Sequence, residues 1–150
     1  MQARRAAREL ALILFSQMDT IENLNKWDFQ DIVLKSVRTL TNNSADELKA
    51  ASAAIMEMKE YIVKIANSYK ENQEDVDAQI KKFAFGWDIN RLVRMDKDIL
   101  RIAIAEIAFI KDAPHKVAID EALELAKKYS TDDSPSFING ILARVVEKYV

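Results

Sequence analysis

The stretch that decides the fold is residues 96–110, which read DKDILRIAIAEIAFI. Ten of these fifteen residues are apolar, and they point to nearly every side of a helix when successive residues are placed about 100° apart. A helix that is apolar almost all round is buried among other elements. The stretch therefore predicts a central helix around which other segments pack.

The rest of the chain also favours helices. Only two glycines and two prolines occur in 150 residues, whereas folds built from strands and turns need many residues with the backbone freedom of glycine. We predict an all-α protein of about seven helices in one domain, residues 1–150. The other expected helices cover residues 3–18; a segment around 27–40; a segment from the capping box at 44–47 to about Glu71, with a break near Asn67–Ser68 or at Asn72; a segment around 76–84, closed by Gly86; a segment that starts near Pro114; and a segment from Ser134–Pro135 to about Lys148.

The composition indicates a globular protein without the residues of common catalytic sites. Hydrophobic residues make up 49% of the chain and charged residues 31%, an ordinary balance for a folded domain. Cysteine is absent, and the single histidine, His115, cannot form a multi-histidine metal site; we expect it at the surface. Glycine-rich phosphate loops and hydrolase motifs are also absent. We therefore expect no catalytic residue, no metal and no cofactor, and a protein that is not an enzyme.

No segment of the sequence predicts a membrane helix. The longest apolar run near the N-terminus, Leu10–Phe15, is too short to span a bilayer. We expect a cytoplasmic protein that does not bind membranes.

Arg4, Arg5 and Arg8 form a basic cluster at the start of a chain whose net charge is −2. On a helix they lie within an arc of about 100°, opposite the apolar face, and we expect this arc to face solvent. It is either a phosphate-binding site or a solvated helix face without a ligand. Three arginines on a single strand would make affinity fall only ~16-fold between about 50 and 200 mM salt. Binding at this cluster would therefore be weak unless a second protein extended the surface.

Acidic residues precede the last predicted helix. Asp132 and Asp133 stand before Ser134–Pro135, a cap and first-turn pair. Negative charge near a helix N-terminus is favourable by a few tenths to about 1 kcal/mol, so a structural role is the plainer interpretation, and contact with a partner is compatible with it. Phe137 is either a core residue or an exposed stacking or interface residue. For Gly140, inside the helical pattern, we expect close packing against a neighbouring helix.

Four blocks in the C-terminal half carry a resemblance. They are DILRIAIAEI (98–107), APHKVAIDEALELAKKY (113–129), TDDS (131–134) and FINGIL (137–142). With their spacing, and with the arginine-rich opening at residues 4–11, these blocks resemble the NusB family of bacterial transcription antitermination factors. The C-terminal blocks are specific, whereas residues 20–90 are similar only in their helical pattern.

The resemblance implies a fold of two helical bundles packed as one domain. It also implies binding to the single-stranded boxA element of ribosomal RNA leader transcripts together with ribosomal protein S10, in a complex that helps RNA polymerase to read through terminators. The residues that the resemblance assigns to RNA binding are Arg4, Arg5, Arg8 and Phe137. The residues that it assigns to partner binding are Asp132, Asp133 and Ser134.

The chain departs from the family pattern at two places. Members commonly carry Tyr or Phe at the position of Ser16, and often His-Lys at the position of Pro135–Ser136. The missing aromatic ring and lysine motivate an alternative function: a helical protein-interaction module that binds S10 or another partner without binding RNA. Some relatives are homodimers, so a monomer and a homodimer both stay open.

Overall fold

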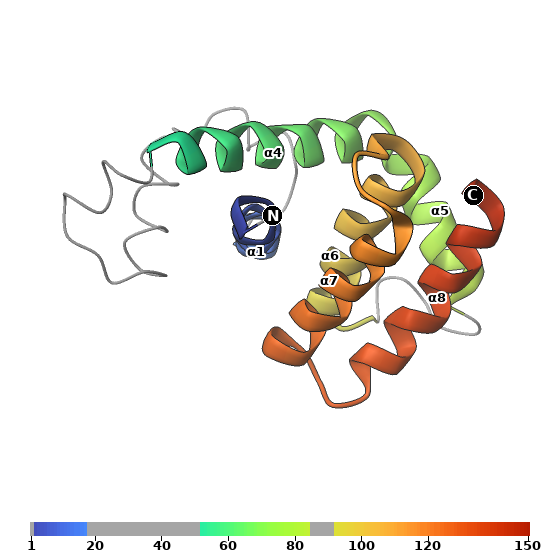
Figure 1. The fold of residues 1–150 in the computed structure, drawn as a ribbon. Coiled ribbons are helices and arrows are strands. Elements are labelled where there is room, and N and C mark those ends of the chain that lie inside the picture. Colours follow the sequence, from blue (N-terminus) through green and yellow to red (C-terminus); the bar gives the residue numbers. More distant parts are fainter. Residues whose placement is uncertain (1, 18–51, 85–91) are drawn as a thin grey trace. The chain divides into compact units, whose positions relative to one another are not determined.

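A computed structural model of the chain describes residues 2–17, 52–84 and 92–150. Every element in these ranges is a helix, as the sequence predicts (Figure 1). The elements are α1 (Gln2–Gln17), α4 (Ser52–Glu71), α5 (Gln73–Phe83), α6 (Arg94–Ile104), the π-helix η3 (Ala105–Ile110), α7 (His115–Tyr129) and α8 (Ser134–Tyr149). None of these described helices is long and apolar enough to cross a membrane. The predicted helix around 27–40, the capping box at 44–47 and Gly86 lie outside the described residues.

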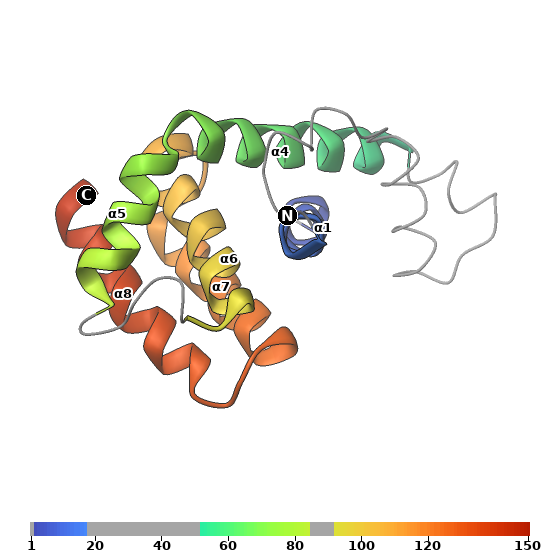
Figure 2. The same ribbon diagram turned by 180° about the vertical axis from the view of Figure 1, so that it is seen from behind.

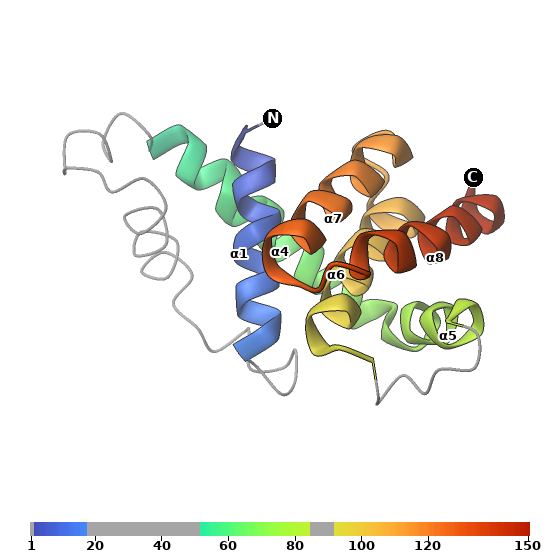
Figure 3. The ribbon, with the colours of Figure 1, turned by 90° about the horizontal axis from the view of Figure 1, so that it is seen from below.

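The chain divides into two compact units, residues 1–66 and 67–150, and each is described by itself. In the first unit, α1 passes across the first part of α4 (Figure 3). The apolar side chains of α1 are buried as its periodicity predicts, with Ala7 at 0% and Leu10 at 2% exposure. That residues 1–150 form one domain stays a prediction.

The second unit is built around α6. This helix contacts α5, α7, α8 and η3, and α7 lies against α8 (Figure 2). The side chains of Ile99, Leu100 and Ile104 are at most 1% exposed. The predicted central helix is therefore confirmed for this unit, because a helix that is apolar almost all round has to be covered on most of its sides.

The predicted helix over residues 96–110 changes its geometry partway along. It begins two residues early, at Arg94, and continues after Ile104 as a π-helix to Ile110. It ends at Lys111, which has a φ of 57° and donates its backbone N–H to the Glu106 carbonyl at 2.8 Å. Glycine is the usual residue in this left-handed conformation, so the lysine provides no sequence signal for this ending.

The break between α4 and α5 lies at Asn72, one of the two predicted positions. Asn67 and Ser68, the other position, lie inside α4. The side-chain amide of Asn72 donates to the Ser68 carbonyl at 2.9 Å, and the backbone N–H of Asn72 donates to the same oxygen at 3.1 Å. Asparagine ends the helix here because its side chain competes for backbone hydrogen bonds.

A polar network joins α6 to α5 and to the end of α4. The Arg101 guanidinium donates to both carboxylate oxygens of Asp77, at 3.0 and 3.2 Å, and to Asp98 at 3.4 Å. It also lies over the Tyr69 ring, 5.2 Å from the centroid, while the Tyr69 hydroxyl donates to Asp77. Arg94 donates to the second oxygen of Asp98 at 3.2 Å. The network fixes the start of α6, which carries part of the site described below.

Asp98 makes a testable contribution to the pH dependence of stability. Burial raises the pKa of Asp98 above its ordinary 3.8, and Arg94 and Arg101 offset only part of that effect. The folded state then binds the Asp98 proton more tightly than the unfolded state, so Asp98 costs stability as pH rises from 3.8 through the raised pKa. We expect the unfolding free energy of wild type minus that of Asp98→Asn to fall across this window. Urea unfolding of both proteins between about pH 4 and 7 measures it, and a difference that rises with pH would contradict it.

Gly140 corrects one expectation about α8. The residue is exposed, and a Cβ atom added to it would meet nothing within 4 Å. The predicted close packing against a neighbouring helix is therefore wrong. The helix is instead covered on the side that carries Ile138, Ile141 and Leu142, all at most 2% exposed. Nothing in the structure explains a glycine at this exposed position.

Candidate nucleic-acid and partner sites

The three arginines at the start of α1 differ in their exposure. Arg5 is exposed, Arg4 is half-buried and Arg8 is only 4% exposed. The expectation that all three face solvent is therefore wrong for Arg8. Arg5 is the cluster member whose guanidinium is best placed to meet a phosphate group.

The ring of Tyr61, from α4, lies against the two less exposed arginines. The guanidinium carbons of Arg4 and Arg8 lie 5.1 and 5.6 Å from the centroid of this ring, which is 5% exposed. Both distances are within the roughly 6 Å at which a cation is attracted to an aromatic face. Arg8 thus stabilises the first unit. Arg4 contacts the Tyr61 ring and is also partly exposed to solvent.

A sequence signal for the burial of Arg8 exists. Arg8, Leu12 and Phe15 are spaced four and three residues apart, so they lie along one stripe of α1. Leu12 is 1% exposed and Phe15 is 5% exposed. The buried face of α1 is therefore wider than the alanine-rich stripe alone predicts, and it includes the middle of the arginine arc.

The exposure of the arginines changes the expected electrostatics. With Arg4 and Arg5 as the two phosphate-binding cations, the slope of log affinity against log salt is about −1.4, and affinity falls ~7-fold between about 50 and 200 mM salt. This contribution is smaller than the one expected for three arginines. Ser16, where relatives commonly have an aromatic residue, lies in α1, and its side chain is outside the described part of the structure.

The acidic motif before α8 lies at the surface of the second unit. Asp132 and Asp133 are exposed, and Asp133 occupies the N-cap of α8 without a hydrogen bond from its side chain to the helix. Ser134 is the first residue of the helix, so the prediction that Ser134 is the cap is wrong by one position. The two carboxylates stand where the positive end of the helix dipole favours them, which fits the structural interpretation.

Ser134 itself is buried, with 1% exposure. Its hydroxyl oxygen lies 2.9 Å from that of Ser130 and 2.8 Å from that of Thr131, and it accepts the Thr131 backbone N–H at 3.2 Å. The Ser130 hydroxyl in turn donates to Asp96 in the first turn of α6. These bonds tie the loop between α7 and α8 to α6. Ser134 therefore has a structural role, and its contact with a partner stays a prediction.

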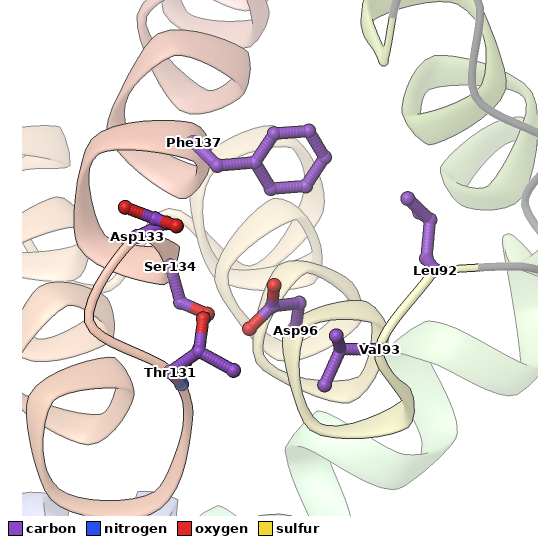
Figure 4. A pocket seen from close by; sticks show the side chains of 7 residues that line it. All are labelled: Leu92, Val93, Asp96, Thr131, Asp133, Ser134 and Phe137. Carbon is purple, nitrogen blue, oxygen red and sulfur yellow. Dashed lines mark hydrogen bonds between the residues drawn. The ribbon is translucent and has the colours of Figure 1, made fainter.

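This bonded loop forms one wall of a pocket of about 260 Å³ (Figure 4). Figure 4 shows the Phe137 ring on one side, Leu92 and Val93 on the other, and the Asp96 carboxylate between them. The pocket combines an apolar surface with two carboxylates, and none of its described lining residues is basic. They are Leu92, Val93, Asp96, Thr131, Asp133, Ser134 and Phe137.

Phe137 and His115 are both half-buried. Phe137 is half-buried and presents its ring to the pocket, so it is neither a closed core residue nor a fully exposed one. Its predicted contact with RNA stays a prediction. His115 is the half-buried first residue of α7. Within the described ranges, no group of three or more potential ligands is arranged to hold a metal ion.

The sequence motifs do not include the other half of the pocket, Leu92, Val93 and Asp96. Val93 is 47% exposed although it is apolar, and Asp96 is 5% exposed although it is charged. In the sequence both residues lie at or just before the start of the predicted central helix, and nothing in their spacing distinguishes them from ordinary helix-start residues. An apolar residue directly before a helix and an acidic one in its first turn are too common to mark a site.

Comparisons with known proteins agree with the fold and with the motifs. The model of the NusB family matches residues 5–147. A transcription antitermination protein NusB of Clostridium novyi is 40% identical over 144 residues, 96% of this chain and 98% of that protein. One of Alkaliphilus oremlandii is 35% identical over 97% of this chain and 94% of that protein.

Solved structures show the same architecture. The chain is similar to T. maritima NusB, with a TM-score of 0.70 and 30% identity over 97% of this chain and 92% of that one. It also has the fold of the chain in a crystal structure of antitermination factors NusB and NusE in complex with double-stranded RNA, with a TM-score of 0.70, 23% identity and 99% of each chain covered.

Proposed function

The chain belongs to the NusB family of transcription antitermination proteins, and we propose that it binds boxA RNA of ribosomal RNA leader transcripts together with ribosomal protein S10. In this proposal the complex acts in the cytoplasm and lets RNA polymerase read through terminators. The observation that carries it is the family match over residues 5–147, which includes Arg5 and the whole motif from Thr131 to Phe137. No catalytic step is part of the proposal.

The RNA side of the proposal rests on the start of α1. Single-stranded RNA is held by cations on its phosphates and by flat groups on which its bases stack, and a guanidinium serves both purposes. Arg5 is exposed, and Arg4 is half-exposed next to Tyr61. The guanidinium of Arg8 also lies over the Tyr61 ring, so Arg8 helps to hold α1 against α4. Two cations bind RNA weakly, and this weakness is the physical reason to expect a second protein.

The partner side rests on the acidic motif. Asp132 and Asp133 are exposed at the start of α8, while Ser134 is buried beneath them. A hydrogen-bonded loop with two exposed carboxylates suits a basic protein better than it suits RNA, since the carboxylates would repel phosphates. We therefore assign Asp132 and Asp133 to the contact with S10, positioned by Ser134.

The test is a gel shift with boxA RNA, with and without S10, at several salt concentrations. We expect S10 to raise the affinity for RNA markedly. We expect Arg5→Glu to weaken RNA binding roughly tenfold at low salt, because the variant loses a phosphate contact and adds a repelling charge. Lys81→Glu changes the charge by the same amount at an exposed position of α5 and is the control. Equal losses in both variants would contradict the assignment of Arg5.

The alternative is a protein-interaction module without RNA binding. The burial of Arg8 favours this alternative, because it removes one arginine from the surface. Ser16 and Pro135–Ser136 favour it as well. A pull-down that retains S10, together with no boxA shift at any salt concentration, would establish this alternative. A boxA shift that S10 strengthens would exclude it.

A further inference from the structure

The pocket between the start of α6 and the start of α8 is smaller than the sites that usually enclose whole small molecules. Its volume of about 260 Å³ is just below the range of roughly 300–1,000 Å³ in which pockets enclose whole small molecules. Phe137, Leu92 and Val93 make its apolar surface, and Val93 remains 47% exposed. The pocket therefore suits a flat or narrow group that arrives from a larger partner.

Asp96 gives the pocket a chemical preference. This carboxylate is 5% exposed, yet the described residues supply it with one hydrogen bond, from the Ser130 hydroxyl to Oδ1. An ionised carboxylate can accept about four hydrogen bonds, so a buried one with a single donor has unused capacity. Ser130 is held in turn by Ser134, so the Asp96 carboxylate is fixed in place before any ligand arrives. The unused oxygen calls for a hydrogen-bond donor.

The charges of the lining residues favour a positively charged hydrogen-bond donor. Asp96 is buried and Asp133 is exposed at the rim, and none of the lining residues that the structure describes carries a positive charge. We propose that this pocket binds the guanidinium group of an arginine from a protein partner, stacked on the Phe137 ring and hydrogen-bonded to the Asp96 and Asp133 carboxylates. The guanidinium is planar, always charged and offers five donors, so it matches the aromatic and acidic parts of the pocket together.

A nucleobase fits the pocket less well. A base could stack on Phe137, but it brings its phosphate toward two carboxylates, and the described lining residues include no cation to offset the repulsion. The proposal therefore moves Phe137 from the RNA side to the partner side of the complex. It rests on the proposed function only in naming S10 as the protein that supplies the arginine.

The direct test uses the full chain and N-acetyl-arginine amide as the probe. We expect saturable shifts of the backbone NMR signals of Thr131, Ser134 and Phe137. We expect no such shifts with N-acetyl-citrulline amide, which has nearly the same shape but no charge. Equal shifts with citrulline, no saturable shift with arginine, or shifts with guanosine or uridine monophosphate in place of arginine would each overturn the proposal.

Substitutions define the contacts. Asp133→Asn should weaken binding of the arginine probe about two- to fivefold, because an ion pair at an exposed carboxylate contributes up to about 1 kcal/mol. Phe137→Leu should weaken it while the pocket stays apolar. Asp96→Asn should weaken binding at least about tenfold, because the hydrogen bond to this carboxylate is buried. The exposed Asp133 keeps the test valid if the buried variant fails to fold. Asp120→Asn removes the same charge from an exposed position of α7 and should bind the probe like wild type.

Binding of S10 is the second readout. Under the proposal, Asp133→Asn and Phe137→Leu reduce the affinity for S10, and Asp120→Asn does not. If wild type binds no S10 but still binds the arginine probe, the proposed partner is wrong and the arginine pocket stands. If wild type binds S10 but does not bind the arginine probe, the pocket assignment is wrong and the proposed function stands.

Discussion

Replacing Arg8 with glutamate is expected to lower the unfolding free energy by about 3 kcal/mol. The side chain is 4% exposed, and its guanidinium lies 5.6 Å from the centroid of the Tyr61 ring. Glutamate would place a negative charge against the negative face of that ring, in a site that removes most of its water. Urea unfolding followed by circular dichroism measures the loss.

Arg5→Glu is the matched control, because it makes the same change on the same helix at an exposed position. We expect it to change stability by less than about 0.5 kcal/mol. The two variants distinguish a role in RNA binding from a role in folding, which the sequence motif does not separate. Arg5→Glu should impair RNA binding, and Arg8→Glu should impair folding. Equal stability of the two variants would show that Arg8 has no structural role.

Replacing Arg101 with alanine is expected to cost about 3 kcal/mol of unfolding free energy. The change removes the two bonds to Asp77 and leaves Asp98, whose side chain is 1% exposed, with Arg94 as its remaining described partner. It also removes the cation from the face of Tyr69. Losing one member of a buried ion pair costs more than the pair contributes, because the other charge stays buried. Chemical denaturation measures the effect.

Lys127→Ala is the control for Arg101→Ala. Lys127 and Glu124 form an ion pair whose side chains are 62% and 63% exposed, so its loss should change stability by less than about 0.5 kcal/mol. A double-mutant cycle with Asp77→Ala and Arg101→Ala isolates the pair itself. A coupling energy near zero in that cycle would contradict the role given to this network.

Local patterns predicted much of the fold. The apolar run from Ile99 to Ile110 identified the central helix of the second unit, because a helix that is apolar all round must be buried whatever its neighbours are. The end of α4 at Asn72 was one of two predicted positions, since an asparagine side chain can supply a competing hydrogen bond at either, and the structure shows that bond at Asn72. The family could likewise be identified from the order and spacing of blocks along the chain.

The parts that the sequence did not predict depend on which elements meet. The π-helix and its end at Lys111 carry no signal, because the left-handed residue is not a glycine. Gly140 was predicted to face a neighbouring helix, but the side of α8 that carries it is uncovered. Periodicity identifies the face on which a residue lies, but it does not identify what covers that face.

The sequence by itself determined that the protein is helical, which helix is central to the second unit and to which family the chain belongs. Only the tertiary structure decided which residues of the motifs are available for binding. Tyr61 of α4 buries Arg8 and leaves Arg5 exposed. Asp96 and Ser130, 34 residues apart, meet beside Phe137 to form an acidic pocket. The physical reason is that burial and hydrogen bonding depend on neighbours in space, and residues distant in sequence supply those neighbours.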